Sequence, residues 1–166
     1  MCTPWPQRPI EKTQPFPMEY VKWHKDLLKY FSNKKDYRVI WKGFTLPDQR
    51  FDLAQRIIDD VAYENIEYHR NKLTYWFGKV DKIIFDTPST AFFQSIFSGI
   101  PSLALYRPKD QRLRENAYGE FGSSLQPYNN IDEGIELVDK FLNGNSLDYI
   151  IQLESEDISA SEILHI

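Results

Sequence analysis

The chain has 166 residues, of which 42% are hydrophobic and 15% aromatic, and its formal net charge is −4. This length and composition suit one domain with a buried core, and they exclude an intrinsically disordered chain. No apolar run reaches the roughly 18 residues of a membrane span, no signal peptide is recognisable, and no basic stripe typical of nucleic-acid binding occurs.

The first 17 residues contain five of the ten prolines, which predicts an extended N-terminal segment. From Met18 to Phe31 apolar residues recur with helical spacing, which predicts an amphipathic helix. No proper strand precedes this helix, because Met1–Thr3 is at best the tail of one and Pro4 follows directly. Two explanations stay open: the chain is a piece of a longer protein cut within that strand, or it is a stand-alone domain with a short first strand.

The rest of the chain alternates short apolar runs with stripes of helical period. The apolar runs predict strands over residues 37–41, 66–69, 82–85, 102–106 and 123–126. The stripes predict helices over residues 53–62, after residue 90, and over residues 110–118 and 131–142, with a helical turn at 73–78 and a flexible loop at 119–122. This alternation predicts an α/β fold, namely a doubly wound, Rossmann-like parallel sheet of five or six strands in three αβα layers.

Composition and charge divide the chain into three parts. Residues 1–17 form the proline-rich segment, residues 18–146 the Rossmann-like domain, and residues 147–166 an acidic amphipathic tail. Residues 144–166 hold five acidic residues and no Lys or Arg, so the remainder of the chain is nearly neutral. Because the tail also carries many Ile and Leu side chains, we expect it to pack against its own body or against another copy.

The stretch VDKIIFDTPSTAFFQSIFSGIPSLALYRP, residues 80–108, carries the candidate site. A buried strand ends at a polar turn and a short helix follows, a pattern typical of a parallel βαβ unit. Asp86, Ser89 and Thr90 are therefore expected at the carboxyl edge of the sheet, where ligands bind and the N–H groups of a helix start favour anions. The sequence predicts a seat for a phosphorylated ligand, and the alternative is that Ser89 or Asp86 only caps the helix.

Other residues are candidates for the same edge. Lys42 ends the first predicted strand and Gly43 permits close backbone approach, so this pair is a candidate phosphate contact, or else Lys42 is a surface lysine at a strand end. Arg107 follows the strand at 102–106, and a guanidinium can grip a phosphate through two hydrogen bonds. Glu120 lies in the predicted flexible loop and is a candidate to hold a ribose or sugar hydroxyl.

The turn Asp-x-x-Ser-Thr after a buried strand, followed about ten residues later by Gly-x-Pro and another strand, resembles the donor half of GT-B glycosyltransferases. The likeness extends over residues 36–143 and is nearest to the bacterial surface-polysaccharide and CDP-glycerol transferase branches. It implies that Ser89, Thr90 and the helix start hold the diphosphate of a nucleotide-activated donor. Lys42 would lie near the phosphates, although the His and Pro that often follow it in the family are missing. Gln94 stands where the family often has a Glu, and an amide can still hydrogen-bond a donor hydroxyl without carrying charge.

The resemblance implies a transferase that moves a sugar or a polyol phosphate from a nucleotide-activated donor onto a surface polysaccharide. This chain would be the donor-binding half, with a nucleotide-sugar or CDP-polyol donor as its partner and an N-terminal acceptor domain missing or replaced by self-association. Two alternatives stay open: a nucleotide-sugar epimerase of the same architecture, which needs carboxylates and a His in its cleft, and a non-enzymatic α/β interaction domain.

The cysteine and histidine residues indicate which cellular compartment and which cofactors to expect. The single cysteine, Cys2, excludes an internal disulfide and fits a reducing cytosol. We therefore expect a cytoplasmic protein, either free or peripheral to the inner face of the membrane. No His pairs with a Cys or an acid at metal-ligand spacing, so no metal and no cofactor are expected. His24 is expected to pack within the first predicted helix, and His69 to be a structural residue at a strand end or, alternatively, a general base.

Overall fold

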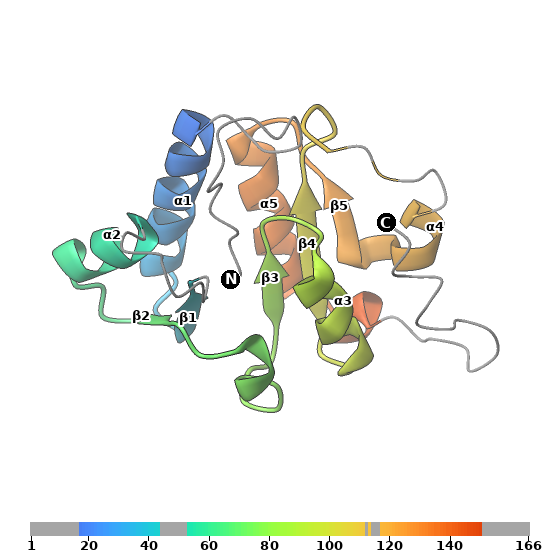
Figure 1. Ribbon diagram of the computed structural model, residues 1–166, viewed down its shortest axis with the longest axis horizontal. Coiled ribbons are helices and arrows are strands. Elements are labelled where there is room, and N and C mark those ends of the chain that lie inside the picture. The colour runs from blue at the N-terminus through green and yellow to red at the C-terminus, as the bar shows by residue number, and fades with distance from the viewer. Residues whose placement is uncertain (1–16, 44–52, 112, 114–116, 151–166) are drawn as a thin grey trace.

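The computed structural model describes residues 17–43, 53–111, 113 and 117–150, and Figure 1 shows their arrangement. The helices and strands follow in the order α1 (Pro17–Ser32), β1 (Val39–Lys42), α2 (Leu53–Val61), β2 (Ile66–His69), β3 (Ile83–Phe85), α3 (Thr90–Phe97), β4 (Ser102–Tyr106), α4 (Ala117–Phe121), β5 (Leu125–Pro127) and α5 (Ile131–Asn143). Short 3-10 turns occur at Leu73–Tyr75, Gly122–Ser124 and Ser146–Tyr149. Most of the predicted N-terminal segment and of the tail, residues 1–16 and 151–166, lies outside the described residues.

The mixed α/β class predicted from the sequence is confirmed, and β2 and β4 have the predicted bounds. The helix predicted over residues 110–118 is wrong for its first part. Asp110 and Gln111 belong to a turn in which both N–H groups bond to the carbonyl of Arg107, and the Arg107 side chain pairs with Asp110 to close it. The loop predicted at 119–122 is also wrong, because residues 119–121 belong to α4.

The described strands form two parallel sheets. β1 pairs with β2, so that Val39 lies opposite Ile66, and β3, β4 and β5 form a second sheet in that order. The described residues therefore show a two-stranded and a three-stranded sheet, whereas a single sheet of five or six strands was predicted. Within each sheet the carboxyl ends of the strands share one edge, because every pairing is parallel.

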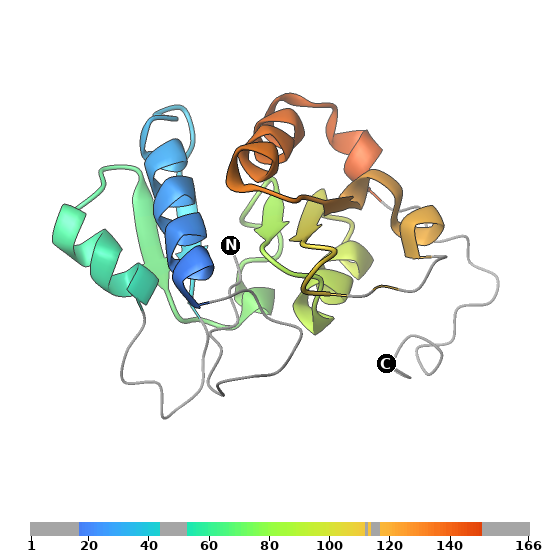
Figure 2. The ribbon, with the colours of Figure 1, turned by 90° about the horizontal axis from the view of Figure 1, so that it is seen from above.

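Helices cover both faces of the three-stranded sheet, with α1 and α5 on one face and α3 on the other (Figure 2). The two faces alternate along β4, as the period of a strand requires. Leu103 and Leu105 belong to the cluster with α1 and α5, whereas Ala104 and Tyr106 belong to the cluster with α3. All five residues of β4 are buried, which is typical of a strand covered on both sides.

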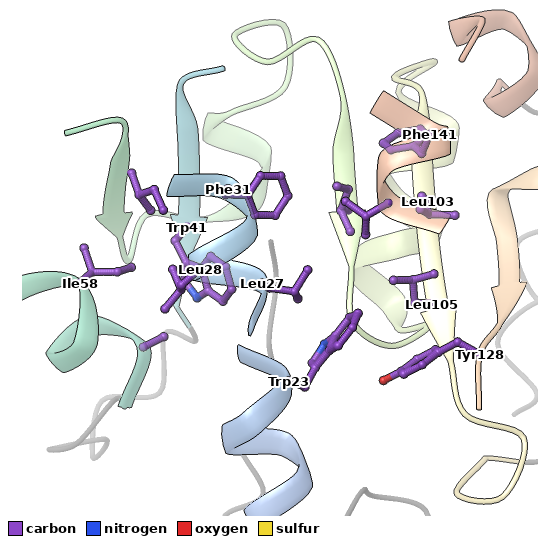
Figure 3. Close-up of a cluster of buried hydrophobic side chains, with 14 of the residues drawn as sticks. Trp23, Leu27, Leu28, Phe31, Trp41, Ile58, Leu103, Leu105, Tyr128 and Phe141 are labelled. Atoms are coloured by element: carbon purple, nitrogen blue, oxygen red, sulfur yellow. The ribbon is translucent and has the colours of Figure 1, made fainter. Parts of the chain in front are cut away.

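Helix α1 connects the two sheets through the larger cluster of buried side chains. Figure 3 shows Leu28 on the side of Trp41 in β1 and Leu27 on the side of Leu105 in β4. Both leucines are fully buried, and each such side chain contributes about 1.5–3 kcal/mol to folding. Because the stripe of α1 contacts both sheets, this helix fixes one sheet against the other.

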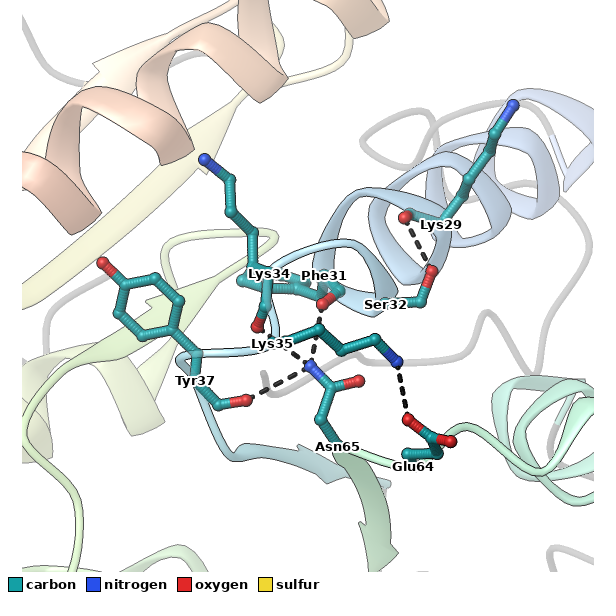
Figure 4. A network of polar contacts seen from close by, with 8 residues as sticks. All are labelled: Lys29, Phe31, Ser32, Lys34, Lys35, Tyr37, Glu64 and Asn65. Atoms are coloured by element: carbon teal, nitrogen blue, oxygen red, sulfur yellow. Dashed lines mark hydrogen bonds and ion pairs between the residues drawn. The ribbon is translucent and has the colours of Figure 1, made fainter.

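Asn65 fixes the turn between α1 and β1 (Figure 4). Its Nδ2 group lies 2.9 Å from the carbonyl oxygen of Phe31, 3.0 Å from that of Lys34 and 3.2 Å from that of Tyr37. Its backbone oxygen accepts a hydrogen bond from the N–H of Val39. The side chain thus satisfies carbonyls that the end of a helix leaves without intrahelical partners, and it holds the start of β2 against the turn.

Candidate functional site

The predicted ligand turn joins the carboxyl end of β3 to the start of α3. Asp86 follows the last residue of β3, and Ser89 stands directly before α3 with an extended backbone, φ −143° and ψ 171°. This is the backbone of an N-cap residue, but the Ser89 side chain makes no capping hydrogen bond. The hydroxyls of Ser89 and Thr90 make no hydrogen bond to the described part of the chain, so the capping alternative gains no support from Ser89.

Asp86 is buried at this edge, with a side chain only 1% exposed. Its Oδ2 atom accepts a 2.9 Å hydrogen bond from the Tyr20 hydroxyl and lies 3.4 Å from Nε2 of His24. Its Oδ1 atom is buried without a hydrogen-bond partner among the residues that the structure describes. A buried carboxylate oxygen in that state carries a desolvation penalty, so Asp86 is the polar group here with the most to gain from a ligand or a water.

His24, on α1, lies between the aromatic rings of Tyr20 in the same helix and Trp41 in β1. Its ring centre is 4.1 Å from that of Tyr20 and 5.4 Å from that of Trp41, and the residue is 2% exposed. Its packing within the helix stripe agrees with the prediction, but its contact with Asp86 was missed. The sequence does carry one signal for it, since Tyr20 and His24 are four residues apart and therefore share one face of α1.

Arg107 lies at the carboxyl end of β4, where it was predicted, but it is paired with protein carboxylates. Its Nη1 atom lies 2.6 Å from a Glu19 oxygen and its Nε atom 3.1 Å from an Asp110 oxygen. Arg107 also lowers the pKa of Glu19, mainly through this hydrogen bond. The guanidinium therefore ties the first turn of α1 to the end of β4 in this structure.

A pocket of about 330 Å³ opens beside this ion pair, lined by Glu19, Trp23 and Tyr128 among other residues. Burial raises the pKa of the Tyr128 hydroxyl, and the negative charge of Asp86 raises it further. Tyr128 therefore lies within electrostatic reach of Asp86. The start of α1 and the ends of β3 and β4 thus meet in one region.

The other predicted residues are more scattered. The buried Lys42 donates from Nζ to the carbonyl of its neighbour Gly43 at 2.9 Å, and the N–H of Gly43 donates to the carbonyl of His69 at 2.9 Å. Gln94 is exposed on α3, and Glu120 is exposed on α4. Of the predicted set, the structure unites Asp86, Ser89 and Thr90 in one turn, and it engages both predicted cations with protein oxygens.

No cluster of three or more His, Cys, Asp or Glu residues within the described ranges is arranged to hold a metal ion. Among the described helices, none combines the length and the apolar character that crossing a bilayer requires. Comparisons with protein-family models, with curated proteins and with solved structures found no match.

Proposed function

We propose that the start of α3 binds the phosphates of a nucleotide-activated donor. The observation that carries this proposal is that the hydroxyls of Ser89 and Thr90 make no hydrogen bond to described residues, although both stand at a helix start. The first N–H groups of a helix have no intrahelical partner, and together with the helix dipole they favour an anion. Two hydroxyls beside those N–H groups add donors of the kind that phosphate oxygens accept.

Asp86 supports the proposal independently. Its Oδ1 atom lacks a partner among the described residues, and the side chain lies three residues before Ser89 at the same strand end. A phosphate would not bind a carboxylate, but a sugar or ribose hydroxyl of the same donor would supply the missing hydrogen bond. One ligand with an anionic part and a hydroxylated part satisfies both features.

The reaction that fits such a ligand is group transfer by a GT-B-like transferase, of which this chain is the donor-binding half. As the bond between the transferred group and the diphosphate breaks, negative charge grows on the leaving nucleoside diphosphate. The hydroxyls of Ser89 and Thr90 and the N–H groups at the start of α3 would stabilise that charge. The acceptor glycan and any catalytic base would be held by another domain, and the reaction would take place in the cytoplasm.

A doubly wound domain of the kind proposed has a single parallel sheet. We propose that the two parallel sheets are parts of one doubly wound sheet, as the alternation of strands and helices predicts. Three observations support this: every strand pairing is parallel, helices cover both faces of the larger sheet, and α1 packs on both sheets.

A nucleotide-sugar epimerase is the second candidate, and the contact of His24 with Asp86 favours it. Such an enzyme needs a His and carboxylates close together, and Nε2 of His24 lies 3.4 Å from Oδ2 of Asp86 in a buried setting. The two candidates differ in what they do with a UDP-sugar alone. Release of UDP without an acceptor, lost in the His24→Gln variant, would favour the epimerase over the transferase half.

Calorimetric titration with UDP, CDP and GDP tests the binding proposal. We expect at least one of them to bind, and the Ser89→Ala/Thr90→Ala variant to bind it more weakly by about 1.5–3 kcal/mol per lost hydrogen bond to a charged group. Ser123→Ala is the matched control, because Ser123 is an exposed serine in the 3-10 turn Gly122–Ser124 and is not part of the turn between β3 and α3. Its affinity should equal that of the unaltered chain.

Equal affinity of the double variant and the unaltered chain would place the phosphates elsewhere. If none of the three nucleotides binds or raises the melting temperature, the donor-binding proposal fails. The non-enzymatic interaction domain would then be the better reading.

A further inference from the structure

The pocket of about 330 Å³ beside the ion pair of Arg107 with Glu19 shares no lining residue with the turn between β3 and α3. One of its walls is the part of α1 between residues 19 and 26, and another is the segment that follows β4. The third wall is residues 128–132, which lead from β5 into α5. Because a water molecule takes up about 30 Å³ of liquid, this volume has room for a ligand of roughly ten non-hydrogen atoms.

Two buried side chains in the walls carry polar groups without a partner. Trp23 is 3% exposed, and its indole N–H is buried with no hydrogen-bond acceptor among the described residues. Tyr128 is 5% exposed and stacks on Trp23 with ring centres 5.0 Å apart, and its hydroxyl makes no hydrogen bond to the described part of the chain. Besides burial and Asp86, the charges of Arg107 and Glu19 act on the pKa of this hydroxyl, so it lies at the pocket end of the ring. Figure 3 shows the Tyr128 oxygen on the side of Trp23 and α1. A ligand oxygen there would remove the desolvation penalty of two unpaired donors.

The rest of the walls adds both donors and acceptors. Lys22, Asp26 and Asp132 line the pocket and make no hydrogen bond or ion pair within the described ranges. Asn130 caps α5 by accepting a hydrogen bond from the N–H of Glu133 through its side-chain oxygen, so its NH2 group remains to donate. The ammonium and the amide are thus two further donors, and the two carboxylates are acceptors.

This combination favours a neutral, hydroxylated ligand over an anion. Arg107 and Lys109 are already engaged by Glu19, at 2.6 and 3.5 Å. The charges that remain are one ammonium and two carboxylates, which disfavour a phosphate or a carboxylate ligand. A hydroxyl group donates to a carboxylate while it accepts from an indole, an amide or an ammonium group, so a ligand with several hydroxyls uses both kinds of wall group.

We propose that this pocket binds one unit of a neutral saccharide. Its hydroxyl oxygens would accept from Trp23 and Tyr128 at the buried end, and its other hydroxyls would donate to Asp26 and Asp132 nearer the surface. A pyranose ring with its hydroxyl groups has the size that the volume allows. The ligand is a free monosaccharide or the terminal unit of a glycan, because the same wall groups recognise both. The inference does not rest on the proposed function, since no residue of the phosphate turn lines the pocket.

NMR titration of the isotopically labelled chain with methyl glycosides of glucose, galactose and N-acetylglucosamine tests the inference. The reporter is the indole N–H resonance of Trp23, identified by its absence from the Trp23→Phe variant. We expect at least one glycoside to shift it saturably, with a dissociation constant of about 1–10 mM for a site that gains only a few hydrogen bonds. The indole N–H groups of Trp41 and Trp76 are the internal control, because both are buried and unpartnered among the described residues but neither lines this pocket. They should not shift. A disaccharide that ends in the same sugar separates the two sources, since tighter binding than that of the glycoside indicates a glycan end and equal binding a single sugar.

Two variants remove one ligand contact each. Tyr128→Phe keeps the buried ring but loses the hydroxyl, and it should weaken glycoside binding about tenfold. Asn130→Asp keeps an oxygen that can cap α5 but replaces the donating NH2 group, and it should weaken binding by about the same factor. Tyr75→Phe is the matched control, because Tyr75 is half exposed and lies outside the pocket, and it should bind as the unaltered chain does. Melting temperatures show whether each variant is folded.

Three outcomes would overturn the inference. The first is that no glycoside shifts the Trp23 resonance saturably. The second is that inorganic phosphate shifts it and the glycosides do not, because the pocket would then be an anion site. The third is that Ser89→Ala/Thr90→Ala abolishes the glycoside effect, which would place the sugar at the start of α3. Binding of UDP, CDP or GDP enters none of these outcomes, so the saccharide site and the nucleotide site can fail separately.

Discussion

Arg107 joins α1 to the turn after β4 through two carboxylates, Glu19 and Asp110. Its side chain is only 10% exposed, and Arg107→Met keeps most of the apolar stem while it removes the cation. We expect the free energy of unfolding to fall by about 1–3 kcal/mol, less than for a fully buried pair because Glu19 is half exposed. Urea unfolding measures the change.

Lys109→Met is the control, because Lys109 is 55% exposed and 3.5 Å from the same Glu19. Its loss should cost about 0–1 kcal/mol. Equal losses would contradict the role given to Arg107.

Glu67 should titrate far below the usual range of a glutamate. Hydrogen bonds from Arg38 at 2.7 and 3.0 Å, and then from His69, lower the pKa of Glu67 to about 2. Because the folded-state pKa lies below the unfolded value, Glu67 contributes stability above its ordinary pKa of 4.5, and this contribution is lost as the pH falls toward 2. In Arg38→Met the pKa of Glu67, measured by NMR titration, should rise toward 4.5, and stability should depend less on pH in that window. Lys35→Met, which removes a separate ion pair with Glu64, should leave the pKa of Glu67 unchanged. A pKa that stays near 2 in Arg38→Met would show that Arg38 is not the cause.

At the scale of elements, Gly134 sets how closely α5 approaches α1. A Cβ atom at this position would lie 2.7 Å from Cη2 of Trp23 and 3.1 Å from Cδ2 of Tyr128, which is closer than packed carbon atoms can sit. Gly134→Ala should therefore cost about 1–3 kcal/mol of overpacking, although alanine by itself favours a helix by about 1 kcal/mol. Gly119→Ala in α4 is the matched control, because nothing lies within 4 Å of the added atom, and it should be neutral or slightly stabilising. The melting temperatures of the two variants measure the difference. A Gly134→Ala protein as stable as the control would show that α5 does not approach α1 this closely.

The elements that the sequence predicts well are those in which one periodic pattern reflects one buried face. α2 and α5 carry apolar stripes of helical period, and β4 is apolar throughout because both of its faces are covered. α4 was missed because its position depends on a turn that Arg107 and Asp110 close, and an ion pair leaves no period in the sequence.

The candidate site, too, could be predicted from the sequence only in part. The turn that holds Asp86, Ser89 and Thr90 could be predicted, because strand, polar turn and helix follow one another directly in the sequence. The contacts of Asp86 with Tyr20 and His24 join residues more than sixty positions apart. The spacing of Tyr20 and His24 places them on one face of α1, but it does not indicate Asp86 as their partner. The engagement of Lys42 and Arg107 could not be predicted either, because it depends on which oxygens folding brings to each cation.

At the scale of the whole molecule, α1 is the element on which the site depends. Its first turns meet β3 and β4 through Asp86 and Arg107, and its middle packs on both sheets. The turn that follows its end is held by two contacts. Asn65 donates a hydrogen bond to the carbonyl of Lys34, and the Nζ atom of Lys34 lies 2.7 Å from Oδ1 of Asp139 in α5. A change that loosens α1 should therefore disturb the candidate site even when it lies far from Ser89.

The start of the acidic tail belongs to the folded body. Tyr149 is buried with its ring centre 4.7 Å from that of Phe141, and its carbonyl accepts a hydrogen bond from the buried Ser124 hydroxyl at 3.1 Å. Deletion of residues 147–166 would remove this aromatic contact and leave Ser124 without its partner. We expect a loss of about 2–4 kcal/mol in the free energy of unfolding, together with greater self-association through the uncovered Phe141.

Deletion of residues 151–166 is the matched control, because it keeps Tyr149 in place. The difference in melting temperature between the two truncated chains isolates residues 147–150, and light scattering reports the mass of each. If the tail also pairs with another copy, the full chain should be heavier than the 151–166 deletion. Equal melting temperatures for the two truncated chains would mean that Tyr149 contributes nothing to the fold, and equal masses for all three proteins would exclude a role for the tail in association.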